Sequence, residues 1–137
     1  MILALHQPYF FPYIGYFSLI ASADVFMFFD NVQYIRKSWM SRNRILKPDR
    51  NEAQYINIGL QKIPYKSMLP NSYLLPDDKW KILILAQLAH YKKVAPFYIE
   101  TIDTLEKILE EKYTSLLEFN IESIKVLVSV LGINTSI

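Results

Sequence analysis

Two polar side chains near the amino terminus, His6 and Asp30, each come directly after a short apolar segment, residues 1–5 and 25–29. A histidine beside a carboxylate can act as a general base near neutral pH, because the carboxylate orients the imidazole ring. The structural alternative is a histidine that ends a strand and an aspartate that accepts backbone hydrogen bonds in a turn. We predict that His6 and Asp30 are catalytic residues.

Basic residues are concentrated in one segment of a chain whose net charge is only +2. Residues 36–66 contain eight Lys or Arg and two acidic residues, and all four arginines fall between 36 and 50. Such a patch suits phosphate, carboxylate or nucleic acid, although a solvated basic loop is the alternative. Trp39 lies within it and can stack on a base or sugar ring while cations hold phosphate, unless it is a core residue.

We therefore predict a binding site for a phosphorylated or nucleotide-linked small molecule. We include Gly15 in this site because a glycine inside a short helix destabilises it by about 1 kcal/mol relative to alanine. Close approach of a ligand to the backbone would explain the glycine, and tight helix–sheet packing is the alternative. With two distant histidines and no cysteine we predict no metal site, and the sequence identifies no cofactor. The predicted binding residues are Gln7, Tyr13, Gly15, Tyr16, Tyr34, Arg36, Trp39, Arg42, Asn43 and Arg44.

The elements that must position these residues begin with a compact strand–helix–strand unit. Residues 1–5 and 25–29 predict two parallel strands, and residues 13–22 predict the helix between them. Their uninterrupted apolar composition is typical of strands that are buried on both faces. Since the carboxyl ends of parallel strands meet at one edge, His6 and Asp30 should lie at the same edge.

The remaining pattern predicts a hairpin, three helices and a final strand. Residues 41–46 and 53–60 alternate as an antiparallel pair, with Arg42 and Arg44 on one face. Helices are expected from Asp77 or Asp78 to about 90, over about 97–111, and from Thr114 or Ser115 to a glycine at 132. Residues 133–137 should form a third parallel strand. The predicted fold is α/β: a small parallel sheet with a Rossmann-like start, a β-hairpin insertion and a carboxyl-terminal helical segment.

We predict a single domain over residues 1–137, in which 1–35 form the βαβ core, 36–66 the basic loop and hairpin, 77–132 the three helices, and 133–137 the start of a further strand. Hydrophobic residues make up 52% of the chain and charged residues 20%, which excludes a disordered protein. No apolar run is long enough to span a membrane, and the first residues do not form a secretory signal, so we expect a cytoplasmic protein.

The sequence resembles the WbqC-like family. The resemblance is dense over residues 1–45, continues loosely to Leu131-Gly132-Ile133, and is carried by His6-Gln7-Pro8-Tyr9-Phe10-Phe11-Pro12-Tyr13-Ile14-Gly15-Tyr16-Phe17, Ala23-Asp24, Asp30-Asn31-Val32-Gln33-Tyr34, Ser38-Trp39 and Arg42-Asn43-Arg44-Ile45. It implies a role in bacterial surface-polysaccharide (O-antigen) and modified-sugar biosynthesis. Family members continue beyond Ile133 into a further region, so this chain resembles their amino-terminal part. A truncated member would expose an apolar edge and self-associate.

A second resemblance concerns the mechanism. Tyr13-Ile14-Gly15-Tyr16 stands where class I nucleotidylyltransferases carry an HxGH motif, and here tyrosines replace both histidines. The main hypothesis is a transferase that passes an acyl, aminoacyl or nucleotidylyl group to or from a phosphorylated or nucleotide-linked sugar. The alternatives are a non-catalytic nucleic-acid or anion-binding module, which the small net charge disfavours, and an inactive fragment that needs a partner.

Overall fold

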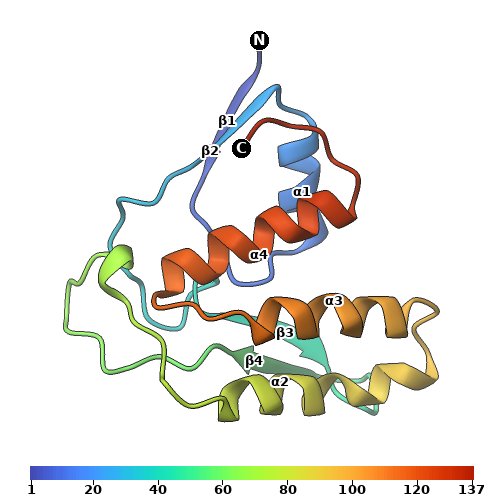
Figure 1. Cartoon of the computed structure of the whole chain (residues 1–137). Coiled ribbons are helices and arrows are strands. Elements are labelled where there is room, and N and C mark those ends of the chain that lie inside the picture. The colour runs from blue at the N-terminus through green and yellow to red at the C-terminus, as the bar shows by residue number, and fades with distance from the viewer.

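The computed structural model describes residues 1–137 and has a mixed α/β fold, as predicted (Figure 1). Two short 3₁₀ turns, η1 (Leu69–Asn71) and η2 (Ala89–Lys93), join the longer elements. No helix is long and apolar enough to cross a membrane. The strands and helices are β1 (Leu3–His6), α1 (Ile14–Ala21), β2 (Val25–Phe28), β3 (Arg42–Leu46), β4 (Ala53–Asn57), α2 (Lys79–Leu88), α3 (Tyr98–Glu110) and α4 (Leu116–Val130).

The predicted strand–helix–strand unit is confirmed. Strands β1 and β2 pair in parallel, with Leu3 opposite Val25 and His6 opposite Phe28. The expected third strand is reduced to one parallel bridge between Val25 and Ser136, in which the Phe26 amide donates to the Ser136 carbonyl at 2.8 Å. The carboxyl-terminal segment therefore lies parallel to β2, but it pairs at this one bridge and forms no regular strand.

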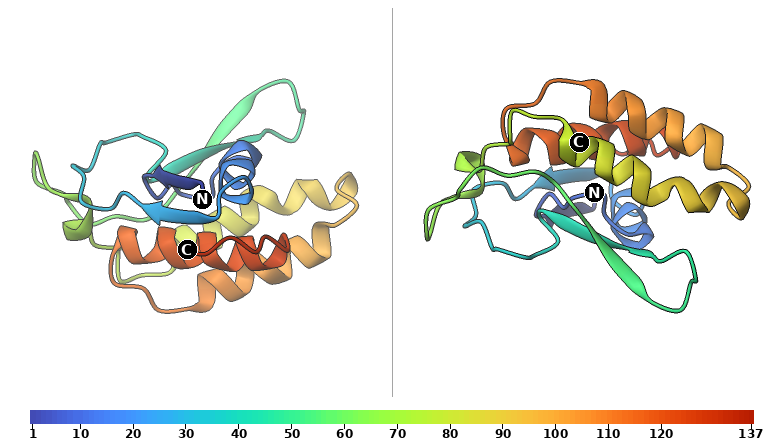
Figure 2. Two further views of the ribbon diagram at one scale, coloured as in Figure 1. Left: turned by 90° about the horizontal axis from the view of Figure 1, so that it is seen from above. Right: turned by 90° about the horizontal axis from the view of Figure 1, so that it is seen from below.

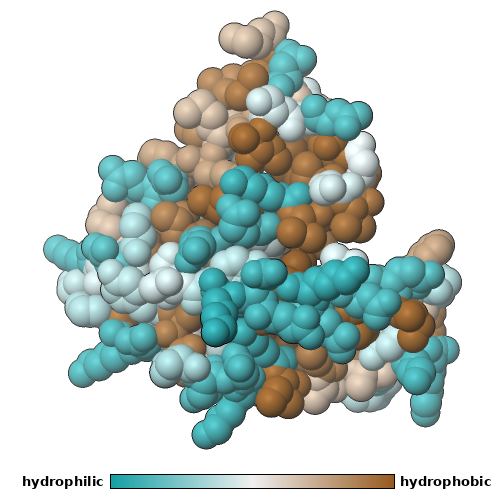
Figure 3. All heavy atoms as spheres, viewed as in Figure 1, coloured by the Kyte–Doolittle hydropathy of each residue, from teal (hydrophilic) through white to brown (hydrophobic).

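The prediction that this sheet is buried on both faces is wrong. Ala4 and Phe26 are buried on one face, where α1 and α4 pack against them. On the other face Leu3, Leu5 and Met27 are 57%, 53% and 52% exposed, because no element of the chain covers them. In Figure 3 hydrophobic side chains gather over the upper part of the molecule, where the sheet and α1 lie. Self-association through such a surface stays a prediction.

Helix α4 contributes to both hydrophobic cores and so joins the two halves of the molecule (Figure 1). Ile124 and Val128, in its second half, pack on α1 and the parallel sheet. Leu116 and Phe119, in its first half, pack on the hairpin, α2 and α3. Figure 2, which shows the molecule from above and from below, shows the tip of the β3–β4 hairpin extending beyond the helices.

The ends of α4 follow the local signals in the sequence. Ser115 caps α4 by accepting a hydrogen bond from the Glu118 amide at 3.2 Å, while the Glu118 carboxylate accepts one from the Thr114 amide at 2.7 Å. Gly132 follows α4 with a φ of +66°, the left-handed conformation expected of a residue that ends a helix. Both features confirm the predicted limits of this helix.

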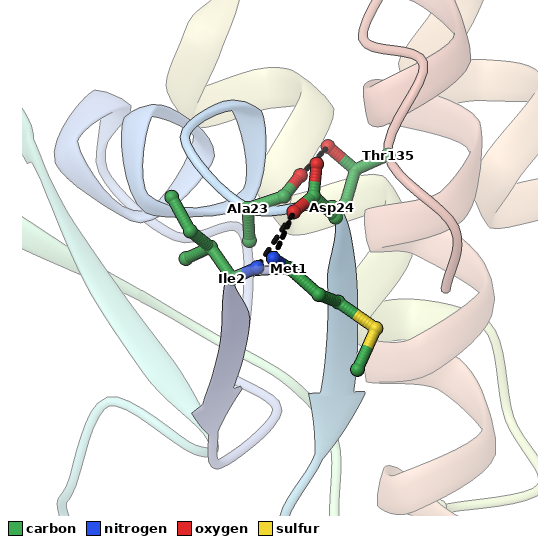
Figure 4. A network of polar contacts seen from close by, with 5 residues as sticks. All are labelled: Met1, Ile2, Ala23, Asp24 and Thr135. Atoms are coloured by element: carbon green, nitrogen blue, oxygen red, sulfur yellow. Dashed lines mark hydrogen bonds and ion pairs between the residues drawn. The ribbon is translucent and has the colours of Figure 1, made fainter.

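A polar network fastens the two chain termini to the α1–β2 turn (Figure 4). The Asp24 carboxylate accepts a hydrogen bond from the Ile2 amide at 2.6 Å and lies 3.8 Å from the amino-terminal ammonium group. On the other side of the turn, the Thr135 hydroxyl lies 2.7 Å from the Ile20 carbonyl and 3.1 Å from the Ala23 carbonyl. This network places the start of β1 and the carboxyl-terminal segment on either side of β2.

Candidate functional site

Seven of the ten predicted binding residues line one of two hollows beside β3, whereas Gln7, Gly15 and Tyr16 line neither. The first, which we call the aromatic hollow, has a volume of about 360 Å³ and is lined by Tyr9, Pro12, Tyr13, Trp39, Asn43 and Arg44. The second, which we call the basic hollow, has a volume of about 390 Å³, and its polar lining includes Tyr34, Arg36, Lys37, Arg42 and Lys62. Arg42 and Arg44 are two residues apart on β3, so they lie on the same face of the strand, about 7 Å from each other. Since each lines one of the hollows, the two hollows are neighbours.

The walls of the aromatic hollow are the loop after β1 and the segment that leads into β3. The Phe10 amide donates a hydrogen bond to the Trp39 carbonyl at 2.8 Å, and the Asn43 side-chain amide donates to the Phe11 carbonyl. Asn120, fully buried on α4, donates to the carbonyls of Pro8 at 3.1 Å and Met40 at 2.8 Å. Residues distant in the sequence are therefore held as one rigid wall around Tyr9 and Trp39.

The aromatic hollow combines ring surfaces with one unpaired cation. The Arg44 guanidinium carbon lies 5.3 Å from the centre of the Trp39 ring, and Trp39 is 40% exposed, which excludes the core role that the sequence left open. Tyr13 is 69% exposed and its ring lies over Gly15, where an added Cβ atom would collide with it. Gly15 therefore gives room to a ring that lines the hollow, rather than to the sheet.

The basic hollow gathers four cations and no carboxylate among its lining residues. The Arg36 guanidinium donates to the Ile63 carbonyl at 2.9 Å, and the Arg42 guanidinium lies 4.0 Å from the centre of the Tyr55 ring. No arginine of the chain forms an ion pair with an acidic side chain, and neither do Lys37 and Lys62. The positive charges of the basic hollow are therefore uncompensated, which favours binding of an anion such as phosphate.

His6 is held by a backbone carbonyl. Its Nδ1 atom lies 3.0 Å from the Gln7 carbonyl, and because a carbonyl only accepts, Nδ1 carries the proton in the neutral ring. The Nε2 atom is then the basic nitrogen, as a general base requires. The rings of Tyr9 and Tyr16 meet the imidazole edge to face, with centroids 4.9 and 5.0 Å away. Tyr9 also lines the aromatic hollow, so His6 contacts a wall residue of that hollow although it lines neither hollow itself.

Tyr16 lies inside the fold. It is 2% exposed, and its hydroxyl donates to the same Gln7 carbonyl at 2.9 Å. Burial, and secondarily the neighbouring Tyr9, raises the pKa of Tyr16 far above its usual value, so the phenol remains a hydrogen-bond donor. Gln7 and Tyr16 thus orient His6 and do not face either hollow, whereas Tyr13, at the other end of the Tyr13–Tyr16 segment, does.

Asp30 follows β2 at the same sheet edge at which His6 ends β1, since the register places His6 opposite Phe28. Its carboxylate is exposed and makes no hydrogen bond or ion pair within the chain, and none joins it to His6. The structure also brings together no group of three or more His, Cys, Asp or Glu side chains suited to a metal ion. A ligand or water between His6 and Asp30 stays a prediction.

Several residues of the site were not predicted from the sequence. Tyr9, Pro12, Lys37 and Lys62 line the two hollows, and Asn120 ties their walls together. Pro12 and Lys37 are adjacent in sequence to the predicted residues Tyr13 and Arg36, so proximity could have suggested them. A polar Asn120 among the apolar residues of an amphipathic helix is the one sequence signal of a buried bridging amide.

The chain is similar in sequence to known proteins. The model of the WbqC-like protein family matches residues 7–137. The chain is also similar to the uncharacterized protein Rv1507c of Mycobacterium tuberculosis, at 31% identity over 133 residues. That alignment covers 96% of this chain and 57% of the relative, so the chain spans little more than half the relative's length. No solved structure matches. The chain belongs to the WbqC-like protein family.

Proposed function

We propose that the chain carries the ligand-binding part of a transferase that acts on a phosphorylated or nucleotide-linked sugar. The observation that carries this proposal is the basic hollow, in which four cations meet without a carboxylate, next to a hollow lined by aromatic rings. Phosphate supplies the negative charge that the basic hollow lacks, and a base or sugar ring supplies the flat surface that stacks in the aromatic hollow. The role in surface-polysaccharide biosynthesis that family resemblance implies, and a cytoplasmic location, belong to this proposal.

Each residue has a specific role in the proposed complex. The guanidinium groups of Arg36 and Arg42 bind phosphate oxygens in the basic hollow, and Arg44 binds a further oxygen in the aromatic hollow. Trp39, Tyr13 and Tyr9 enclose the ring. The Tyr34 hydroxyl, which lies 3.1 Å from the Ser41 hydroxyl in the basic hollow, donates a hydrogen bond to the ligand or accepts one from it.

The reaction that suits His6 is transfer of an acyl or aminoacyl group. Nε2 takes the proton of the acceptor hydroxyl or amine as the new bond to the acyl carbon forms, and the bond from that carbon to its carrier breaks. The carrier leaves with the electron pair and receives the proton. Nucleotidylyl transfer is the second candidate. It has less support because the Tyr13–Tyr16 segment offers no imidazolium to the phosphates and Tyr16 is buried.

A screen of nucleotide sugars and sugar phosphates by thermal shift tests the binding step. A ligand at a hundred times its dissociation constant stabilises the fold by about 2.7 kcal/mol. Arg36→Gln and Arg42→Gln should each weaken the binding of such a ligand, as should Arg44→Lys, which loses the bidentate fork. Arg50→Gln is the matched control, because Arg50 lies in the same basic segment but lines neither hollow.

Equal affinity in the wild-type chain and all three hollow variants would refute the proposal. A salt titration distinguishes the alternative of a nucleic-acid-binding module. Binding to nucleic acid should fall steeply with salt, because each phosphate contact releases a counterion, whereas a small ligand with two phosphates has a shallow dependence.

A further inference from the structure

The aromatic hollow continues along Pro12 into an apolar groove. A neighbouring hollow of about 250 Å³ shares Pro12, Asn43 and Arg44 with it. That hollow in turn shares Pro12, Leu105 and Leu127 with a third one of about 490 Å³, which lies between α1, α3 and α4. The two further hollows, which we call the apolar groove, therefore adjoin each other and the aromatic hollow, with Arg44 at the polar end.

The lining of the groove offers almost no hydrogen bonds. Ile45 and Leu88 line its inner part, and Phe97 and Val130 its outer part. Two threonines on α3 also line it, but the Thr101 hydroxyl donates to the Phe97 carbonyl at 2.7 Å and the Thr104 hydroxyl to the Glu100 carbonyl at 2.8 Å. In Figure 3 hydrophobic surface continues from α1 and the carboxyl end of α4 towards α3.

The outer part of the groove is open to solvent. Ile14, Phe97 and Val130 are 71%, 70% and 62% exposed, which leaves a contiguous apolar surface at the end of the groove. Surfaces of this kind mark binding sites, because covering them removes apolar area from water. Glu100 is the one charged residue that lines this part.

We propose that the apolar groove binds the acyl chain of a ligand whose phosphate-bearing head occupies the aromatic and basic hollows. This inference rests on the proposed function, which it extends by assigning a fatty-acyl donor. Charge complementarity supports it, since the uncompensated Arg44 guanidinium stands where the head meets the chain.

Isothermal titration with coenzyme A and with its acetyl, hexanoyl and decanoyl thioesters tests the inference. Coenzyme A supplies phosphates and a base for the two hollows, so all four should bind. Each methylene that enters the groove should tighten binding about fourfold, as expected for its removal from water. Val130→Glu should abolish the dependence on chain length and leave coenzyme A affinity unchanged, because Val130 is exposed and touches only the groove. Ile82→Glu, an equally exposed position on α2, is the control.

The outcomes separate this inference from the proposed function. If coenzyme A binds and chain length has no effect, the acyl inference is wrong while the phosphate site stands. If neither coenzyme A nor any nucleotide sugar binds, the proposed function itself fails. Decanoate that binds as tightly as decanoyl-coenzyme A would refute the link with the phosphate site. A dimer that Val130→Glu dissociates, without any effect of chain length, would identify the groove as a contact between two copies and overturn the inference.

Discussion

Asn120 should be one of the most sensitive positions for both stability and binding, although it touches no ligand site directly. Its side-chain amide donates two hydrogen bonds in the interior, to the Pro8 carbonyl at 3.1 Å and to the Met40 carbonyl at 2.8 Å. Pro8 precedes the first aromatic wall residue, and Met40 follows Trp39. Asn120→Ala removes both donors and leaves two buried carbonyls without their partner.

The magnitude follows from the two orphaned acceptors. Leaving a buried acceptor unsatisfied costs roughly 1–3 kcal/mol, so Asn120→Ala should lower the free energy of unfolding by about 2–6 kcal/mol. That is a large part of the roughly 5–15 kcal/mol that stabilises an ordinary domain. Ser123→Ala is the matched control: Ser123 is also fully buried on α4, but its hydroxyl donates only to the Asn120 carbonyl within the same helix. It should cost about 1 kcal/mol.

Urea unfolding followed by circular dichroism measures both free energies, and hydrogen exchange shows where the structure loosens. The Phe10 amide, which donates to the Trp39 carbonyl, should exchange faster in Asn120→Ala and at the wild-type rate in Ser123→Ala. Ligands of the aromatic hollow should also bind more weakly in the first variant alone. Equal unfolding free energies in the two variants, with unchanged exchange at Phe10, would show that Asn120 does not hold the walls together.

Three further predictions concern single positions. Because burial raises the pKa of Tyr16, the phenol ionises first in the unfolded chain, and the free energy of unfolding should fall as pH rises above about 10. In urea unfolding across that range, Tyr16→Phe should show a weaker fall, and an identical fall would contradict the assigned cause. Gly15→Ala should keep or raise the melting temperature, since alanine favours the helix by about 1 kcal/mol, but the added methyl group should displace the Tyr13 ring. Ligands that stack on this ring should then bind several-fold more weakly, and unchanged affinity would show that the Tyr13 ring does not contact the ligand. Thr135→Val should destabilise the fold by about 1–3 kcal/mol and speed hydrogen exchange of the Phe26 amide, because it removes the hydroxyl that fastens the carboxyl-terminal segment. Exchange of Phe26 at the wild-type rate would show that the bridge to Ser136 alone holds this segment in place.

The local elements of this protein could be predicted from the sequence because short-range interactions set them. The apolar runs on either side of residues 13–22 predicted the parallel pair, Ser115 and Gly132 predicted the limits of α4, and alternation in 41–46 placed Arg42 and Arg44 on one face. Each of these signals acts over a few residues. The shared sheet edge of His6 and Asp30 followed directly, since two parallel strands end on the same side.

Only the tertiary structure decided how these elements meet. An apolar strand is compatible with burial on one face or two, and packing of α1 and α4 on one side left Leu3, Leu5 and Met27 exposed. The division of the arginines between two hollows, and the bridge from Asn120 to residues 112 and 80 positions away, depend on which distant segments arrive at β3. Periodicity fixes where a side chain points relative to its own strand or helix, whereas its partners are set by the long-range packing that folding alone produces.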